Sequence, residues 1–190
     1  MYMIFKEIID VLLSIIIVLF MLPLFLIVSI LIILDSKGPV LFVQQRVGKN
    51  LKIFKIYKFR TMHVYNRAGS SFRTEKNDSR ITKVGKILRK LSIDELPQLI
   101  NVLKGEMSLI GPRPEVPEQE NDYIDKVKYF FRHKFKPGIS GYAQVKFRSN
   151  ANFHQRLAAD IFYINNLSFY LDLKILIATF SVVFLRKGVV

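Results

Sequence analysis

A run of 24 residues without a charge, Val11–Leu34, constrains this chain of 190 residues more than any other feature. As an α-helix the run would be about 36 Å long, against roughly 30 Å for the hydrocarbon core of a bilayer. It is longer than the apolar core of a signal peptide, and no small-residue cleavage site follows it. The run therefore predicts a helix that enters a membrane.

Pro23 lies at the midpoint of this run. Proline removes a backbone hydrogen bond and costs about 3 kcal/mol relative to alanine inside a helix. Two interpretations stay open from the residues alone: a kinked helix that spans the bilayer, or a helix that turns back and leaves by the face it entered.

The charge of the chain is concentrated after the apolar run. The formal net charge is +14, and residues 37–90 hold 15 Lys and Arg against only two acids, Glu75 and Asp78. Such a block favours phosphate-bearing partners, namely lipid headgroups, nucleic acid or a nucleotide-type substrate, although charge runs are often just solvated faces. It also predicts that the following domain lies on the cytoplasmic side of the membrane. We therefore divide the chain into a membrane-inserted helix, 1–35, and a domain on the cytoplasmic face, 36–190.

Composition excludes several chemistries. The absence of cysteine excludes disulfides, thiolate nucleophiles and Cys-ligated zinc. The three histidines, His63, His133 and His154, are too widely spaced to favour a zinc site. A metal ion would then be a hard cation held by carboxylates, such as Mg²⁺.

Patterning predicts an α/β fold that is rich in helix, with a small sheet. Two β-rich runs, 40–47 and 51–62, flank Gly48-Lys49-Asn50 and predict a hairpin, followed by a surface loop over 63–79. Helices are expected over the ranges 81–91, 98–103, 117–134 and 156–165, and a short strand over 139–145. The segment 175–185 predicts either a core helix or an amphipathic helix on the membrane surface.

Within the range 117–134, one apolar stripe is expected to face the core. Its members recur at helical spacing, and they are Ile124, Val127, Phe130 and Phe131.

The adjacent acids Asp94 and Glu95 follow a strongly basic segment. Ser92-x-x-Glu95 fits a capping box, which is the commoner explanation for acids in such a place. Pro97 would then be the fifth helical residue, where its missing N–H leaves a carbonyl unpaired. This local conflict is typical of functional sites, so a catalytic interpretation stays open beside the structural one.

Chemistry supplies that alternative. A carboxylate can attack phosphorus when metal and basic side chains neutralise the electrophile, and a neighbouring acid can hold the Mg²⁺. Basic residues suited to neutralising phosphate oxygens flank the pair in the sequence, and they are Lys58, Arg60, Arg89 and Arg113.

Four ordered segments carry a resemblance to a known family. They are Lys58–Met62 (KFRTM), Leu91–Leu99 (LSIDELPQL), Asn101–Pro114 (NVLKGEMSLIGPRP) and Lys136–Val145 (KPGISGYAQV). Over about residues 6–176, the chain resembles the bacterial sugar transferases, and among them the monotopic polyprenyl-phosphate phosphoglycosyl transferases. Without an added domain, it is similar to the minimal members.

The resemblance implies transfer of a sugar-1-phosphate from a UDP-sugar to polyprenyl phosphate, normally undecaprenyl phosphate, with release of UMP. It implies that Asp94 is the nucleophile and that Glu95 supports Mg²⁺ binding. Family residues expected to contact substrate fall on Arg89, Arg113, Arg148 and Asp160. Phe147 and Ser149, beside Arg148, depart from the family pattern.

The resemblance also implies a re-entrant N-terminal helix in the bacterial inner membrane, with both ends cytoplasmic. The family breaks that helix at a Ser-Pro pair, and Leu22-Pro23 stands there in this chain. Expected partners are the UDP-sugar, the polyprenyl phosphate and membrane lipid, but no nucleic acid.

Two alternatives to this chemistry remain. The first is a single-pass membrane anchor carrying a basic domain that binds nucleic acid or anionic lipid, which explains the charge but not Asp94, Glu95 or Arg113. The second is direct attack of the lipid phosphate on the UDP-sugar, without an enzyme adduct.

Overall fold

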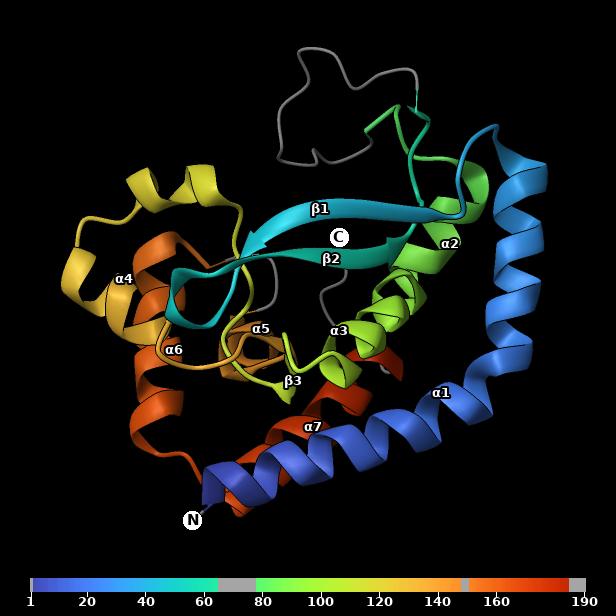
Figure 1. Cartoon of the computed structure of the whole chain (residues 1–190). Helices are drawn as coiled ribbons and strands as arrows, with labels where there is room; N and C mark the ends of the chain where they lie inside the picture. The colour runs from blue at the N-terminus through green and yellow to red at the C-terminus, as the bar shows by residue number, and fades with distance from the viewer. Residues whose placement is uncertain (1, 65–77, 148–150, 185–190) are drawn as a thin grey trace.

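The structure, a computed structural model, describes residues 2–64, 78–147 and 151–184 (Figure 1). Its α-helices are α1 (Tyr2–Asp35), α2 (Lys83–Lys90), α3 (Leu99–Leu103), α4 (Lys126–Arg132), α5 (Tyr142–Phe147), α6 (Phe153–Asn165) and α7 (Phe169–Phe184). Its strands are β1 (Leu41–Val47), β2 (Ile53–Phe59), β3 (Ser108–Ile110) and β4 (Gly138–Ser140), and 3₁₀ turns cover η1 (Lys49–Leu51), η3 (Ile93–Gln98) and η4 (Pro117–Asp122). The fold is helix-rich with small sheets, as the sequence predicts.

Helix α1 is 34 residues long and stays one α-helix through Pro23. Figure 1 shows that it bends into two arms, one beneath the domain and one beside it. Its buried residues fall into two groups: Lys6, Asp10 and Ser14 before the proline, and Val28 and Ile32 after it. Each arm therefore packs on a different part of the domain.

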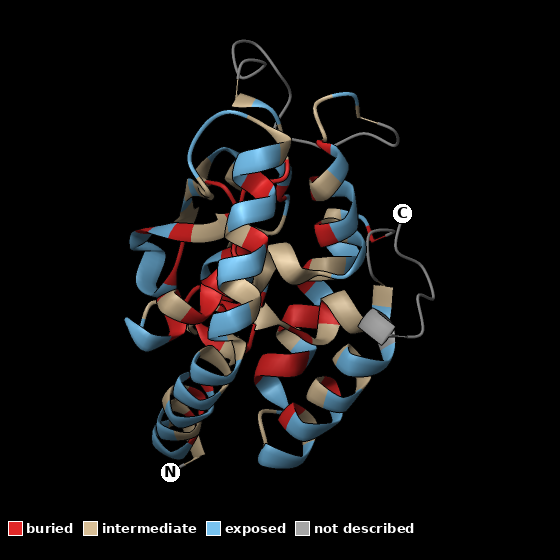
Figure 2. Ribbon diagram, turned by 90° about the vertical axis from the view of Figure 1, so that its right-hand side faces the viewer, coloured by how far each residue is buried: buried red, intermediate tan, exposed pale blue. Residues whose placement is uncertain are grey.

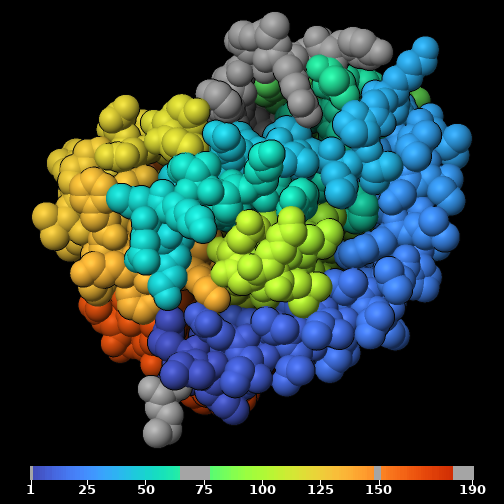
Figure 3. Space-filling model, in the orientation of Figure 1, coloured from blue at the N-terminus to red at the C-terminus, as the bar shows by residue number. Residues whose placement is uncertain are grey.

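The outer side of α1 has no partner among the described residues. Most side chains between its two contact groups are exposed (Figure 2), and in the space-filling view α1 forms the lower and right-hand margins of the molecule (Figure 3). Among the helices in the described part of the chain, α1 is the one that is long enough and apolar enough to cross a membrane. Its length and exposed apolar surface suggest membrane association.

The predicted hairpin is confirmed. Strands β1 and β2 pair antiparallel, from Leu41 opposite Phe59 to Val47 opposite Ile53. Phe59 packs in one core cluster with Val28 and Ile32 of α1, which fixes the end of β2 against the second arm of that helix. Of the predicted surface loop, residues 65–77 lie outside the described residues.

The expected strand over 139–145 is only partly correct. Strand β4 ends at Ser140 because its parallel partner β3 has just three residues, Ser108–Ile110. The chain then turns at Gly141, and Val145 donates its N–H to the Gly141 carbonyl within a helical turn. The residues after Gly141 therefore form α5.

The expected helix over 117–134 is two elements, η4 and α4, separated by residues 123–125. The predicted core stripe is wrong for Ile124 and Val127, each 81 % exposed, and for Phe130, whereas Phe131 packs against a core cluster. The buried face instead carries Tyr129 and Arg132, whose guanidinium pairs with buried acids. Ion pairing, rather than apolar content, decides which side of α4 turns inward.

At the C-terminal end, the predicted helix 175–185 corresponds to α7, which begins earlier, at Phe169. Ile175 belongs to a core cluster with Ile110, Tyr163 and Ile164. The opposite side is exposed and apolar, with Tyr170, Leu173, Ile177 and Phe180 at helical spacing. A membrane-surface role for this helix stays a prediction.

Candidate active site

The acidic pair lies in the first turn of η3, between α2 and α3. Ser92 adopts a left-handed conformation with φ of 54°, and its side chain makes no capping hydrogen bond. The capping-box interpretation is therefore wrong. The Ser92 N–H instead bonds to the Arg89 carbonyl at the end of α2, and this tight turn directs the chain into a 3₁₀ helix that accommodates Pro97.

Glu95 is held by two cations from separate elements. Lys58, near the end of β2, places Nζ 2.6 Å from Glu95 Oε1. Arg113, between β3 and η4, places Nη2 3.2 Å from the same oxygen. The Glu95 side chain is only 22 % exposed, so these contacts are shielded from water.

The environment separates the two acids electrostatically. Burial alone would raise the pKa of Glu95, but Lys58 and Arg113 outweigh it and hold that pKa well below its usual range. Burial, followed by the negative charge of Glu95, raises the pKa of Asp94, although Lys58 and Arg89 oppose this. Two neighbouring carboxyl groups whose pKa values are pushed apart are suited to different chemical tasks.

Burial also acts on the cations. It lowers the pKa of Lys58, against the opposing charge of Glu95. The charge of Glu95 raises the pKa of Arg113 more than burial lowers it. Since the Arg113 side chain is 44 % exposed, its guanidinium can meet a ligand in solution while keeping one contact to Glu95.

Asn101 fixes the position of β2 relative to η3, and sequence reasoning missed it. This residue of α3 is fully buried. Its Oδ1 accepts from the Tyr57 N–H at 3.1 Å, and its Nδ2 donates to the Lys55 carbonyl at 2.7 Å. The side-chain amide thus pairs with the β2 backbone beside Lys58. A polar residue inside the apolar segment LINVL was the available signal.

The loop that carries Arg113 is held at its backbone. Gly138 donates its N–H to the Pro112 carbonyl, and Gly111 donates to the Ser140 carbonyl, each at 2.9 Å. A Cβ on Gly111 would lie 2.6 Å from the Lys136 carbonyl oxygen, so the close approach of the two strands requires glycine there.

A buried ion-pair cluster lies behind this loop, and most of it was not foreseen. Arg132 Nη2 lies 2.8 Å from Asp160 Oδ2 and also donates to the Arg113 carbonyl at 2.8 Å. Arg132 Nη1 lies 3.1 Å from Glu115 Oε1, a carboxylate that Tyr123 also contacts through its hydroxyl. The cluster therefore holds the backbone of Arg113 from inside the protein.

Asp160, expected among the substrate-contacting residues, belongs to this cluster. It is 2 % exposed, and burial raises its pKa to about 6 even though Arg132 lowers it. Its contact is with Arg132, which in turn supports Arg113. The structure thus places Asp160 beneath the loop rather than on its surface.

The remaining predicted residues fall in three places. Arg89, in the last turn of α2, is near enough to Asp94 to lower its pKa electrostatically. Arg60 is 2 % exposed, and its Nη2 donates to the carbonyls of Ile32 and Ser36 at the end of α1, so these contacts bind α1 rather than the acidic pair. Arg148 lies outside the described residues.

The acidic pair fits Mg²⁺ only in combination with a ligand. No group of three or more His, Cys, Asp or Glu residues able to hold a metal occurs in the ranges described. Mg²⁺ in proteins is commonly bound by one or two carboxylates together with substrate phosphates. Asp94 and Glu95 match that pattern, since Glu95 uses one carboxylate oxygen for both of its ion pairs.

Comparison with known proteins identifies the family. The sequence pattern of the bacterial sugar transferases matches residues 1–186. An exopolysaccharide production protein of Rhizobium leguminosarum bv. phaseoli is 40 % identical, and the match covers 94 % of both chains. The chain belongs to the bacterial sugar transferase family.

Two similar relatives carry more specific names. A UDP-glucose:undecaprenyl-phosphate glucose-1-phosphate transferase of Klebsiella pneumoniae is 40 % identical over 98 % of this chain and 41 % of its own length. A UDP-N-acetylgalactosamine-undecaprenyl-phosphate N-acetylgalactosaminephosphotransferase of Aeromonas hydrophila is 41 % identical over 98 % of this chain and 45 % of its own length. The chain spans less than half the length of these two relatives.

Proposed function

We propose that this protein transfers a sugar-1-phosphate from a UDP-sugar to undecaprenyl phosphate, giving undecaprenyl-diphospho-sugar and UMP. The observation that carries the proposal is the acidic pair, in which the pKa values of Asp94 and Glu95 shift in opposite directions. Lys58 and Arg113 both contact Glu95. The names of the Klebsiella and Aeromonas relatives support the same donor and acceptor classes.

Asp94 is the nucleophile of the proposed first step. Its carboxylate attacks the β-phosphorus of the UDP-sugar, an O–P bond forms, and the bond from that phosphorus to the bridging oxygen breaks as UMP leaves. Arg89 and Lys58 favour the ionised carboxylate that this attack needs. In the second step a phosphate oxygen of the lipid attacks the same phosphorus, and Asp94 is released.

Glu95 and the cations prepare the site for a diphosphate. Arg113 is exposed enough to contact phosphate oxygens and offers a bidentate fork, whereas Lys58 supplies a point charge. Bound at Asp94 and Glu95, Mg²⁺ would neutralise charge on the diphosphate oxygens. Because Glu95 stays ionised, it retains negative charge for that cation throughout the working pH range.

The proposed location is the cytoplasmic face of the bacterial inner membrane. The apolar surface of α1 supports insertion, and the basic block over 37–90 favours the cytoplasmic side. The bend of α1 into two arms, together with the proline inside this helix, supports a re-entrant helix whose ends leave by the same face. A UDP-sugar would then meet the membrane-bound acceptor at the interface.

The covalent step gives a direct test. The purified protein is incubated with Mg²⁺ and a panel of UDP-sugars but no lipid, and we expect a stoichiometric burst of UMP together with a protein-bound sugar phosphate. Asp94→Asn should abolish both signals. Asp125→Asn, at a half-buried N-cap of α4, is the matched control and should leave the burst intact.

Two results would contradict this mechanism. An absent adduct, combined with near-normal turnover of Asp94→Asn, would exclude the aspartyl intermediate. Initial-rate plots that intersect, instead of running parallel, would indicate direct attack of the lipid phosphate on the donor.

A further inference from the structure

The first arm of α1 carries charged residues that are buried against the domain. Lys6 is 7 % exposed and Asp10 is 6 % exposed, although both belong to a helix that is otherwise strongly apolar. Burying a charge is costly unless it is paired and hydrogen-bonded, so these side chains require specific partners.

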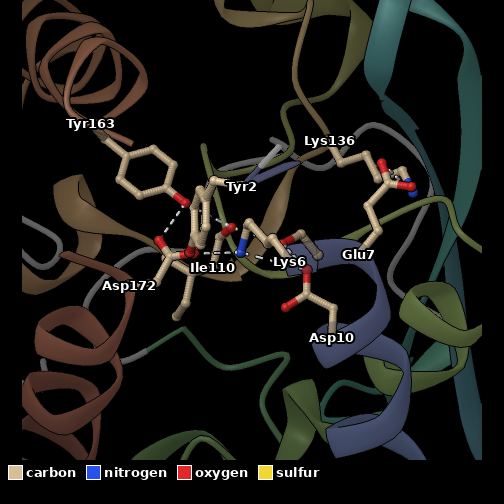
Figure 4. Close-up of polar contacts among 9 residues, drawn as sticks. Tyr2, Lys6, Glu7, Asp10, Ile110, Lys136, Tyr163 and Asp172 are labelled. Carbon is tan, nitrogen blue, oxygen red and sulfur yellow. Dashed lines mark hydrogen bonds and ion pairs between the residues drawn. The ribbon is translucent and has the colours of Figure 1, made fainter. Parts of the chain in front are cut away.

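The partners come from three separate elements. Lys6 Nζ lies 2.7 Å from Asp172 Oδ2 in α7 and 3.5 Å from Asp10 Oδ2 in its own helix. Asp172 also accepts from the hydroxyls of Tyr2, at 2.6 Å, and Tyr163, at 2.7 Å. Figure 4 shows these side chains converging between α1, α6 and α7. We call Tyr2, Lys6, Asp10, Ser108, Tyr163 and Asp172 the foot cluster.

The foot cluster also holds both ends of β3. At one end, the Ser108 hydroxyl lies 2.5 Å from Asp10 Oδ2. At the other end, the Tyr163 hydroxyl that donates to Asp172 also lies 3.1 Å from the Ile110 carbonyl oxygen. Gly111, Pro112 and Arg113 follow Ile110 directly, so the strand fixed by the membrane helix leads into the loop that contacts Glu95.

A second contact from α1 reaches the segment that leads into the other strand of the same sheet. Lys136 Nζ lies 3.1 Å from Glu7 Oε1, and the next residue, Pro137, accepts the Ser108 N–H. Strands β3 and β4 have three residues each, too few to fix their own position without packing partners. The sheet beneath Arg113 therefore depends on α1 for its placement.

We propose that Asp10 is a positioning residue for the active site: through the Ser108 hydroxyl and the Leu109 N–H it fixes β3, and through β3 it sets the place of the Arg113 guanidinium. In consequence, the site for the phosphates of the UDP-sugar is complete only when the first arm of α1 is packed against the domain. This inference rests on the proposed function, since it assigns Arg113 to the UDP-sugar.

The first test is a double-mutant cycle that measures the KM for the UDP-sugar. Losing a hydrogen bond to a charged group should raise the KM about tenfold in Asp10→Ala. In an Arg113→Lys background, the Asp10→Ala change should raise it no further, because the residue through which it acts is already altered. Ser108→Ala removes one of the two contacts between Asp10 and β3, the other being the Leu109 N–H, so it should raise the KM less than Asp10→Ala and should add nothing to the effect of Asp10→Ala.

Ser14→Ala is the matched control. Ser14 lies one turn after Asp10 on α1 and is fully buried, and its hydroxyl has no hydrogen-bond partner among the described residues. Its removal should leave the KM unchanged in both backgrounds. If instead the Asp10→Ala and Arg113→Lys effects multiply, Asp10 does not act through Arg113 and the proposal is wrong.

Hydrogen–deuterium exchange provides a readout independent of turnover. Asp10→Ala and Ser108→Ala should speed exchange at the Gly111 and Gly138 amides, which bond across β3 and β4, while Ser14→Ala should not. Unchanged exchange in both variants would overturn the proposal even if the enzyme is active. A wild-type protein that turns over no UDP-sugar would contradict the proposed function, and the exchange result would still decide the positioning role.

Discussion

Lys58 and Glu95 form the shortest ion pair of the acidic site, with Nζ 2.6 Å from Oε1. The contact joins β2 to the 3₁₀ helix η3, so the hairpin and the acidic pair are held in one arrangement. It also keeps Glu95 charged, whereas burial, followed by the negative charge of Glu95, raises the pKa of Asp94.

Replacing Lys58 should weaken activity and shift its pH dependence. In Lys58→Met the pKa of Glu95 rises, because a main source of its stabilised charge is lost, so the acidic limb of the pH–rate profile should move to higher pH. A lost charge-assisted hydrogen bond predicts a fall in kcat of about 10- to 100-fold. Lys104→Met is the control, because Lys104 is exposed and donates to the hydroxyl of Tyr57, the neighbour of Lys58 in β2, instead of to Glu95.

Removing Arg132 should destabilise the protein strongly. Arg132→Met leaves Glu115 and Asp160 buried without their cation, which is expected to cost about 3–5 kcal/mol. Lys128→Met, on the same helix, breaks only an exposed pair and should change stability by less than about 1 kcal/mol. Denaturant unfolding in detergent measures both. Equal free energies of unfolding for Arg132→Met and Lys128→Met would show that the buried cluster does not hold the Arg113 loop.

Stability should depend on pH through His133. Burial, followed by the charge of Arg132, lowers the pKa of this histidine to about 4 from its ordinary 6.5. The unfolded chain therefore takes up a proton first, and stability should fall by about 3 kcal/mol as the pH drops from 6.5 to 4. In His133→Phe, which keeps the ring packed on Tyr129, this fall should be absent. If the free energy of unfolding of His133→Phe falls with pH as steeply as that of the wild type, other groups cause the pH dependence.

Pro23 should control the topology of α1. A cysteine placed before Lys6 should resist labelling from outside the cell, because a re-entrant helix keeps both ends cytoplasmic. Pro23→Ala restores a backbone hydrogen bond and should shift part of the population toward spanning, seen as new external labelling. External labelling of the wild-type background would indicate a spanning helix instead.

Metal removal should stop the first step. Chelation of Mg²⁺ should abolish the UMP burst, since two carboxylates and two cations alone leave the diphosphate charge incompletely neutralised. Adding Mg²⁺ back should restore the burst in the wild type but not in Asp94→Asn. A full burst under chelation would remove Mg²⁺ from the proposal.

Local sequence patterns predicted those helices and strands that depend on residues close together in the chain. The hairpin follows from β-rich runs around Gly48, and α2 from its helical spacing. The buried face of α4 could not be predicted this way, because Arg132 turns inward toward Asp160 and Glu115, which lie far along the chain or in another element. The apolar stripe of Ile124 and Val127 pointed to the wrong side for that reason.

The residue types of the candidate site were predictable from the sequence, but the contacts that hold these residues in place were not. The sequence indicated that Lys58 and Arg113 are suited to accompany an acidic pair, and the structure places both on Glu95. Arg60 has the same charge and similar surroundings in sequence, yet it binds carbonyls of α1. Spacing does not distinguish a cation that meets phosphate from one that holds a helix end.

The contact of Asn101 with the β2 backbone bears on the order of folding. A short hairpin can form early from local contacts, but a two-stranded ribbon alone specifies its register weakly. Asn101 can bond the Tyr57 N–H and the Lys55 carbonyl only after α3 has packed against β2. These two bonds fit only one register of β2. A slip of one residue would turn Lys58 to the opposite face, so the late docking of Asn101 selects the alignment that gives Glu95 its cation.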